Sequence, residues 1–285
     1  MLRTNCLAVA VSGSGALCFT SGTLDGSSLT SCVAGGAPVY LTGDNSGFSG
    51  KMTVTCVGSP TEVDGATLHL GHASSFGGAM LAETADGLLL EKYGFLYPEE
   101  TMTLDAANRG IKIVSGGFDV PEGVALTVSV PLAINGAAVK KGAGELALGG
   151  AATFASGSFT VKEGAVRALS DDAVAGDFAF ADGTTIVQDP EATLVNGFTG
   201  TFSVVGEGTP KVYVSFDKSH ARSNVYTIPV CTVSSSAADL TDSIEFAAVR
   251  GYTARLVKEN VTVGGEPCVR YSAEWRRSGF ILSFR

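Results

Sequence analysis

Short runs that alternate between apolar and polar residues recur along the chain, and glycine stands at most of their ends. The clearest set lies in residues 139–169, where 145–148, 158–162 and 165–169 each alternate. This pattern predicts β-strands that bury one face. Strands of this length cannot bury a face alone, so we expect copies of the unit to stack above and below one another.

The same residues carry a motif of lysine, spaced glycines, a Leu-x-Leu strand, an aromatic residue and a Thr-Val strand. Its positions are Lys140 or Lys141, Gly142, Gly144, Leu146, Leu148, Gly150, Phe154, Gly157, Val161 and Gly164. The motif resembles the autotransporter-associated β-strand repeat in passenger regions of bacterial surface proteins. Ala152 and Val166 depart from that repeat, which usually has Asn and Leu there. The resemblance implies a right-handed parallel β-helix that is exported to the cell surface, and it brings no catalytic residues.

Two further stretches repeat part of the motif, with an aromatic residue, a glycine and a valine in the same order. They are Phe48, Gly50 and Val54, and Phe198, Gly200 and Val204. The aromatic positions of the three copies lie 106 and 44 residues apart. Both intervals are near multiples of ~22 residues, a length typical of one coil of a β-solenoid. We therefore predict an all-β chain whose residues 1–215 form a right-handed parallel β-helix, with Phe48, Phe154 and Phe198 inside.

The amino-acid composition changes near residue 216, where polar and charged residues become more frequent. Gly264-Gly265 separates two strand-like runs and predicts a β-hairpin. A solenoid leaves its last coil open, so we expect residues 216–285, which contain Trp275, to form an antiparallel C-terminal cap. Between the repeat copies, residues 87–96 are the one run that we expect to be a short helix or an irregular excursion.

Composition narrows the class of protein. Glycine accounts for 37 of the 285 residues, charged residues for 16%, and the formal net charge is −9. An acidic chain without a basic stripe is a poor ligand for nucleic acid or anionic lipid. No apolar run reaches the ~18 residues of a membrane helix, so we expect no transmembrane segment. The apolar run 6–11 is short for a signal peptide, and we expect the export signal to lie outside this sequence.

The six cysteines lie far apart, and none forms a Cys-x-x-Cys pair. We therefore expect no zinc site, and we interpret the cysteines as small buried residues, with disulfides near the N-terminus as the alternative. His69 and His72 have an odd spacing on a predicted strand, which directs them to opposite faces and excludes a shared metal. His220 stands alone in a polar stretch. We predict no metal and no cofactor.

The sequence also predicts no catalytic residues. Asp171-Asp172, Gly71-His72 and Arg109-Gly110-Ile111-Lys112 are superficially similar to three polygalacturonase motifs, but their order is wrong and two are altered. No nucleophile elbow, phosphate-binding loop or dinucleotide fingerprint is present.

We therefore expect a non-enzymatic, surface-exposed or secreted segment that acts as a stalk or adhesin, with extracellular glycans or cell-surface proteins as partners. One alternative is a carbohydrate-active β-helix, either a lyase or a hydrolase. Another is a glycan-binding module, with Tyr93, Phe95, Tyr97 and Tyr213 as stacking residues. A β-sandwich binding module is a third.

Overall fold

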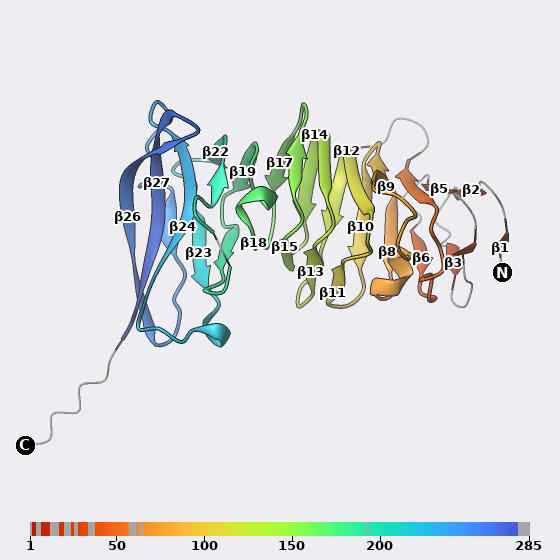
Figure 1. Ribbon diagram of the computed structural model, residues 1–285, viewed down its shortest axis with the longest axis horizontal. Helices are drawn as coiled ribbons and strands as arrows, with labels where there is room; N and C mark the ends of the chain where they lie inside the picture. The colour runs from red at the N-terminus through yellow and green to blue at the C-terminus, as the bar shows by residue number, and fades with distance from the viewer. Residues whose placement is uncertain are drawn as a thin grey trace, which may run out of the picture.

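The computed structural model describes residues 38–56, 61–62, 65–192 and 194–278, and the backbone of five strands before residue 38. In this part of the chain nearly all regular structure is β-strand, and the strands follow one another along the long axis (Figure 1). The strands are β1 (Leu2–Arg3), β2 (Leu7–Val11), β3 (Leu17–Phe19), β4 (Leu24–Asp25), β5 (Ser28–Val33), β6 (Val39–Leu41), β7 (Lys51–Thr55), β8 (Thr67–Leu70), β9 (Thr84–Glu91), β10 (Gly94–Pro98), β11 (Met102–Leu104), β12 (Arg109–Asp119), β13 (Ala125–Val128), β14 (Leu132–Lys141), β15 (Glu145–Leu148), β16 (Ala152–Phe154), β17 (Ser158–Val161), β18 (Ala165–Ala168), β19 (Phe178–Ala181), β20 (Thr185–Gln188), β21 (Phe198–Thr199), β22 (Phe202–Val205), β23 (Val212–Phe216), β24 (Val225–Ser234), β25 (Ile244–Phe246), β26 (Tyr252–Val263) and β27 (Glu266–Arg277). The 3-10 helices are η1 (Ala73–Phe76), η2 (Asp171–Ala173) and η3 (Lys218–His220).

Most of these strands pair in parallel. A 14-stranded sheet and a seven-stranded sheet contain the parallel strands, apart from the small β1–β4 pair and the β21–β24 contact. In the seven-stranded sheet Leu126 pairs with Leu146, Leu146 with Val166 and Val166 with Ile186, so each of these three steps along the sheet advances the chain by 20 residues. The protein is therefore all-β with long parallel sheets, as the alternating pattern predicted.

Equivalent positions of successive strands form two columns of mostly apolar side chains in the core. One column in the 14-stranded sheet contains Val39, Leu68, Leu96, Phe118, Lys140, Val161, Phe180 and Val204. The column in the seven-stranded sheet contains Met102, Leu126, Leu146, Val166, Ile186 and Val214. All of these residues are buried except the half-buried Val204. Each strand therefore buries its apolar side chains beside those of the neighbouring strands, and this burial is the main source of stability in such parallel sheets.

Aromatic rings continue the core toward the C-terminal half. Phe159, Phe178 and Phe202 are successive members of one column. Phe48 and Phe198 are buried, as expected for interior residues, whereas Phe154 is only half-buried and packs edge-on against Phe178. Two of the three phenylalanines predicted to lie inside are thus buried, whereas Phe154 lies at the edge of the core.

Glycines of the repeat meet two different backbone requirements. Gly142 has a φ of 76°, a conformation that is costly for residues with a side chain. Gly157 lies so close to the neighbouring coil that an added Cβ would be 2.1 Å from the carbonyl oxygen of Gly136. The first glycine allows a sharp corner, and the second allows two coils to approach each other.

Among the residues whose side chains are described, two buried cations interrupt the apolar core. Lys140 is fully buried in its column, and its Nζ donates hydrogen bonds to the carbonyl oxygens of Gly142, Gly144 and Glu163, the last two at 2.6 and 2.7 Å. The three protons of the ammonium group thus meet three carbonyl acceptors from two successive corners. Burial lowers the pKa of Lys140 to about 8.

Arg109 is bound in a similar way near the N-terminal end of the described region. Its guanidinium donates to the carbonyl oxygens of Phe48, Gly50 and Gly78 at 2.8, 2.9 and 3.0 Å. It also lies 5.5 Å from the centroid of the Phe48 ring. Burial lowers the pKa of Arg109 to about 10. One side chain therefore ties together three backbone segments that are distant in the sequence.

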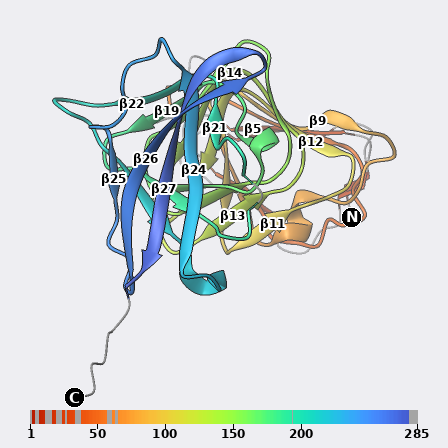
Figure 2. The ribbon, with the colours of Figure 1, turned by 60° about the vertical axis from the view of Figure 1, so that its left-hand side comes forward.

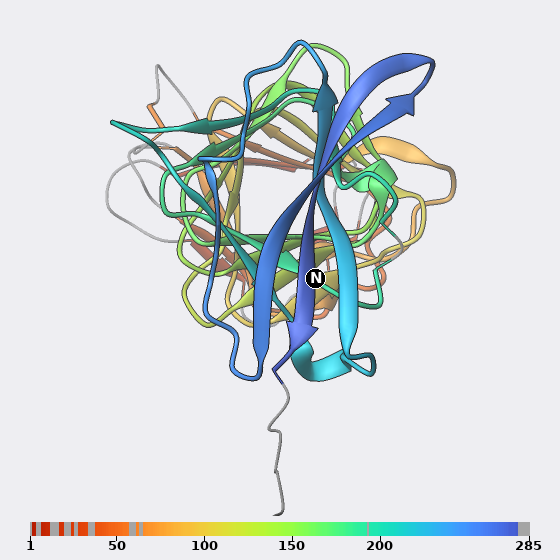
Figure 3. The same ribbon diagram turned by 90° about the vertical axis from the view of Figure 1, so that its left-hand side faces the viewer.

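A four-stranded sheet of order β21-β24-β27-β26 lies across the C-terminal end of the parallel stack (Figures 2 and 3). Its β24–β27 and β27–β26 pairs are antiparallel, and Val263 and Glu266 close the hairpin around Gly264-Gly265, as predicted. β25 belongs to the same C-terminal part of the chain, but it pairs in parallel with β23.

One side-chain cluster attaches this sheet to the stack. Gln188 at the end of β20 accepts a hydrogen bond from Trp275 Nε1 at 2.7 Å and donates to the carbonyl oxygens of Ile228 and Pro229. Trp275 also stacks on Phe216, with ring centroids 5.3 Å apart. A buried polar contact and an aromatic contact thus fix the same junction.

The expectation for residues 87–96 is wrong. All of these residues except Lys92 and Tyr93, which form the bend between the two strands, belong to β9 and β10, and both strands join the 14-stranded sheet. Residues 88–90 are three successive leucines, a run without the period of a strand. They nonetheless pair with both neighbouring strands, so tertiary pairing overrides the local pattern.

Candidate functional site: an arginine-centred carboxylate cluster

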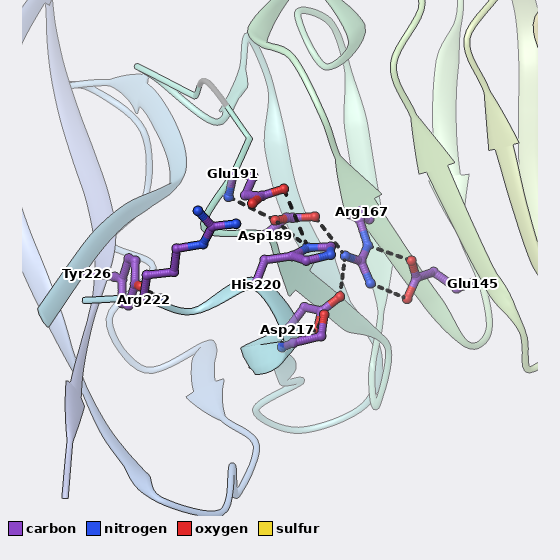
Figure 4. Close-up of polar contacts among 9 residues, drawn as sticks. Glu145, Arg167, Asp189, Glu191, Asp217, His220, Arg222 and Tyr226 are labelled. Atoms are coloured by element: carbon purple, nitrogen blue, oxygen red, sulfur yellow. Dashed lines mark hydrogen bonds and ion pairs between the residues drawn. The ribbon is translucent and has the colours of Figure 1, made fainter. Parts of the chain in front are cut away.

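The densest group of charged side chains lies on the outer face of the seven-stranded sheet, next to the C-terminal sheet (Figure 4). Glu145 begins β15, and Arg167 lies on β18 one strand further along the stack. Asp189 and Asp217 directly follow β20 and β23, which are also paired neighbours. Asp189 and Asp217 come together because parallel strands end at the same edge of a sheet, and the long Arg167 side chain reaches both of them as well as Glu145.

Arg167 is the centre of the cluster. Its Nε and Nη2 contact the two carboxylate oxygens of Glu145 at 2.6 and 3.3 Å. Its Nη1 contacts Asp189 Oδ2 at 3.1 Å and Asp217 Oδ2 at 2.8 Å. One guanidinium therefore bridges strands β15 and β18 to the loops after β20 and β23, a set that spans four successive strands.

His220 lies at the open side of the cluster, at the end of η3. Its Nδ1 is 3.8 Å from Asp189 Oδ1 and 3.8 Å from Glu191 Oε2, and its side chain is 49% exposed. Four carboxylates thus surround one guanidinium and one imidazole, so negative charge is in excess here.

The electrostatics fix the charge states of the central groups. Burial opposes the charged form of Asp217, but hydrogen bonds from Ser219 and Arg167 outweigh it and lower the pKa of Asp217 to about 2. Burial likewise opposes the charge of Arg167, yet its bonds to Glu145 and Asp217 raise its pKa above the ordinary value. Both groups therefore stay ionised at neutral pH.

Asp189, Asp217 and His220 are the described residues best placed to hold a cation, because one ligand atom from each lies within 4.8 Å of the others. Carboxylate and imidazole groups suit zinc and related divalent ions. However, Arg167 already occupies one oxygen of each aspartate, and Asp217 Oδ1 accepts hydrogen bonds from Ser219. The geometry is that of an ion-pair network more than of a ligand shell.

Asp217 is a poor candidate for a general acid. A glycosidase needs one carboxylic acid that is protonated at working pH, which requires a raised pKa. The pKa of Asp217 moves in the opposite direction. The arginine that brings the carboxylates together therefore also keeps Asp217 from acting as a proton donor.

The residues with a polygalacturonase-like pattern have other partners. Asp171 accepts backbone N–H groups of Val195, Asn196 and Gly197 at 2.9 to 3.2 Å, so it anchors a loop. His72 is hydrogen-bonded to the carbonyl oxygen of Thr42 and to the hydroxyl of Ser74. Together with the buried Arg109, these contacts account for the three patterns as structural residues.

The aromatic candidates for sugar stacking differ in their burial and in their partners. Phe95 is fully buried, and Tyr93 and Tyr213 are half-buried. Tyr97 belongs to an outer ladder in which His69 lies between Tyr40 and Tyr97, with ring centroids 4.2 and 4.4 Å apart. His69 therefore covers one ring face of each of these two tyrosines.

The repeat positions themselves belong to the strands and corners of the parallel sheets. Leu146 and Val161 are interior residues, Gly142 and Gly144 supply carbonyl oxygens to Lys140, and Gly50 supplies one to Arg109. The remaining repeat positions form corners and strands: Leu148, Gly150, Val54, Gly164, Gly200 and Val204. Cys56 is buried, Cys231 and Cys268 are free thiols, and the other three cysteines lie outside the residues whose side chains are described.

The sequence interpretation missed Glu145, Arg167, Asp189 and Asp217. A signal for the first three was present, because opposite charges recur at 22-residue intervals, close to the coil length. Two charges one coil apart on an outward position become neighbours in a parallel stack. That inference needs the strand register, which the repeat motif alone does not define.

Within the described residues no helix is long and apolar enough to cross a membrane. Comparison of the chain with protein-family models, curated proteins and solved structures finds no match in any of the three.

Proposed function

We propose that the parallel strands form a right-handed parallel β-helix that serves as a non-enzymatic, surface-exposed or secreted structural or adhesin-like segment. The observation that carries this proposal is the core column from Val39 to Val204, which runs in register through eight paired strands. At ~4.8 Å per strand, such a stack supplies length and a repetitive outer surface. Right-handed winding is the usual hand of parallel connections.

The proposal assigns different structural roles to two parts of the chain. Residues 1–215 would form the stack, and residues 216–285 would cover its last coil, where otherwise apolar side chains and unpaired backbone groups would meet water. The Gln188–Trp275 hydrogen bond supports this division, because it joins the last part of the stack to the antiparallel sheet.

The resemblance to autotransporter passenger repeats supports export to the cell surface and partners such as extracellular glycans or cell-surface proteins. This part of the proposal rests on analogy. The arginine-centred cluster supports a non-enzymatic role, since its carboxylates are engaged in ion pairs that join successive coils.

A carbohydrate-active β-helix is the second candidate. It is favoured by one observation, the gathering of Asp189, Asp217 and His220 on one outer face.

Two assays on the purified chain and on cells that produce it test these proposals together. The first measures reducing-sugar release from a panel of polysaccharides beside binding to a glycan array. The second labels intact cells with an antibody against the chain. Surface labelling without sugar release supports the structural or adhesive role. Sugar release that is lost in Asp217→Asn would overturn it in favour of the enzyme.

A further inference from the structure

Strand β26 is a long, exposed edge at the end of the molecule. It pairs only with β27 among the described strands, and it lies farthest from the N-terminal end in Figure 1. Unpaired backbone N–H and C=O groups on such an edge are ready to bind another strand. The edge carries charged residues, so its charge pattern decides which strand it accepts.

Alternate residues of β26 lie on the outer face of the C-terminal sheet. Arg255, Val257 and Glu259 pair with Glu274, Ser272 and Arg270 of β27 and share this face. Arg255 and Glu259 contact Glu274 and Arg270 within the chain, but each side chain is still 63% exposed. An arginine and a glutamate at this exposure retain capacity for a second partner.

A second copy of β26 can pair antiparallel with the first in one register that places opposite charges opposite one another. In a two-fold antiparallel pair, the central residue faces its own copy, so the choice of centre fixes every other contact. Centring on Val257 places Arg255 opposite Glu259 of the other copy, twice, with the two valines between them. Centring on Arg255, Lys258 or Glu259 places like charges together, and centring on Leu256 pairs no opposite charges.

The remaining charge of the strand does not oppose this register. Lys258 would lie opposite Leu256 of the other copy, and its Nζ is already 2.8 Å from Asp239 Oδ2 within the chain. The polar flanks pair Thr253 with Val261 and Ala254 with Asn260. No like charges face one another anywhere in the paired strands.

We propose that two copies of this chain associate through antiparallel pairing of their β26 strands, centred on Val257, so that two stacks are joined at their C-terminal ends. The pairing goes beyond the role proposed above, and its failure would leave that role untouched. Its energetic basis is a continuous eight-stranded sheet with two cross-strand ion pairs and a central apolar contact.

Sedimentation velocity over a concentration series tests the proposal with a charge swap. The parent chain should show a reversible monomer–dimer equilibrium. Arg255→Glu alone and Glu259→Arg alone should each raise the dimer dissociation constant at least tenfold, because each places like charges opposite one another twice. The double variant carrying both changes should restore dimerisation.

Arg250→Glu is the matched control, since it reverses an exposed arginine just outside β26 and should leave the dimer unchanged. Circular dichroism establishes that every variant is folded. A parent chain that stays monomeric at all concentrations would overturn the proposal, and so would a folded double variant that stays monomeric. Dimers that are insensitive to both single reversals, or binding of unrelated β-strand peptides in preference to a second copy, would also overturn it.

Discussion

The ammonium nitrogen of Lys140 lies 2.6 Å from the carbonyl oxygen of Gly144, inside a column whose neighbouring members are Phe118 and Val161. A charge in this position would normally be strongly destabilising. Here the corner of the chain that begins at Gly142 folds back over the lysine and supplies carbonyl groups. The Lys-x-Gly-x-Gly pattern thus has a physical explanation: the glycines allow the chain to turn so that backbone carbonyl groups surround the lysine and form a cage.

Replacement of Lys140 by methionine should destabilise the protein by about 2–4 kcal/mol. The new side chain fills the space, but it removes the Nζ donor from the carbonyl oxygens of Gly142 and Glu163, at ~1–3 kcal/mol for each one that water cannot reach, whereas the carbonyl oxygen of Gly144 keeps the backbone N–H of Ala165. Urea denaturation followed by circular dichroism measures the change. Lys162→Met, which removes an exposed lysine one strand away, is the control and should cost much less. Equal losses for the two variants would contradict the cage.

The same lysine should give the protein a characteristic pH dependence. Its pKa is about 8 in the folded state against an ordinary value of 10.5, so the folded state holds fewer protons between these values. Stability should therefore rise as the pH increases from about 8 to 10.5, and the Lys140 contribution should be constant below pH 8. The difference in unfolding free energy between the parent and Lys140→Met, measured across this range, isolates the effect. A difference that falls or stays flat would contradict it.

Phe159 should be among the most sensitive positions of the core. It is fully buried and lies in the column between Ala138 and Phe178. Phe159→Ala should cost about 3–5 kcal/mol, and Phe159→Asp should cost more because it buries an unpaired charge. Phe154→Ala, at a half-buried ring, should cost clearly less. Thermal melting of the three variants tests this order, and equal melting temperatures for Phe159→Asp and the parent would refute it.

Gln188→Leu should loosen the C-terminal sheet. The substitution removes the acceptor of Trp275 Nε1 and the side-chain donor to the carbonyl oxygens of Ile228 and Pro229, so three buried hydrogen bonds are lost. We expect a loss of about 2–4 kcal/mol. Trp275 is the only tryptophan, so its fluorescence reports this junction directly. An emission maximum that shifts to longer wavelength before global unfolding supports the account, and unchanged fluorescence and stability would count against it.

The arginine-centred cluster should contribute to acid stability. The pKa of Asp217 is about 2 in the folded state against an ordinary value of 3.8. The contribution of Asp217 is therefore fully present above about pH 4 and is lost as the pH falls toward 2. Asp217→Asn should flatten the dependence in this range, whereas Asp172→Asn, at an exposed carboxylate, should leave it unchanged. If the unfolding free energy of the parent and of Asp217→Asn changed with pH in the same way, the contribution assigned to Asp217 would be disproved.

The sequence predicted the β class, the Gly264-Gly265 hairpin and an antiparallel C-terminal sheet, because alternation and turn residues are local signals. It did not predict that residues 87–96 pair as strands, since three successive leucines carry no strand period. Nor did it predict the contacts of Arg167, which join residues as far apart as Glu145 and Asp217. Such contacts depend on the number of residues in each coil, and that number varies along the chain.

Pulsed electron paramagnetic resonance on two pairs of spin labels tests the central claim, that successive strands stack in parallel register. Thr103, Thr127, Ala147, Arg167, Val187 and Ser215 occupy one outer column of the seven-stranded sheet. Labels introduced through a noncanonical amino acid at Thr103 and Val187 should lie ~19 Å apart, and labels at Thr103 and Ser215 ~24 Å apart, one strand spacing more. A Thr103–Ser215 distance equal to or shorter than the Thr103–Val187 distance would contradict the stack.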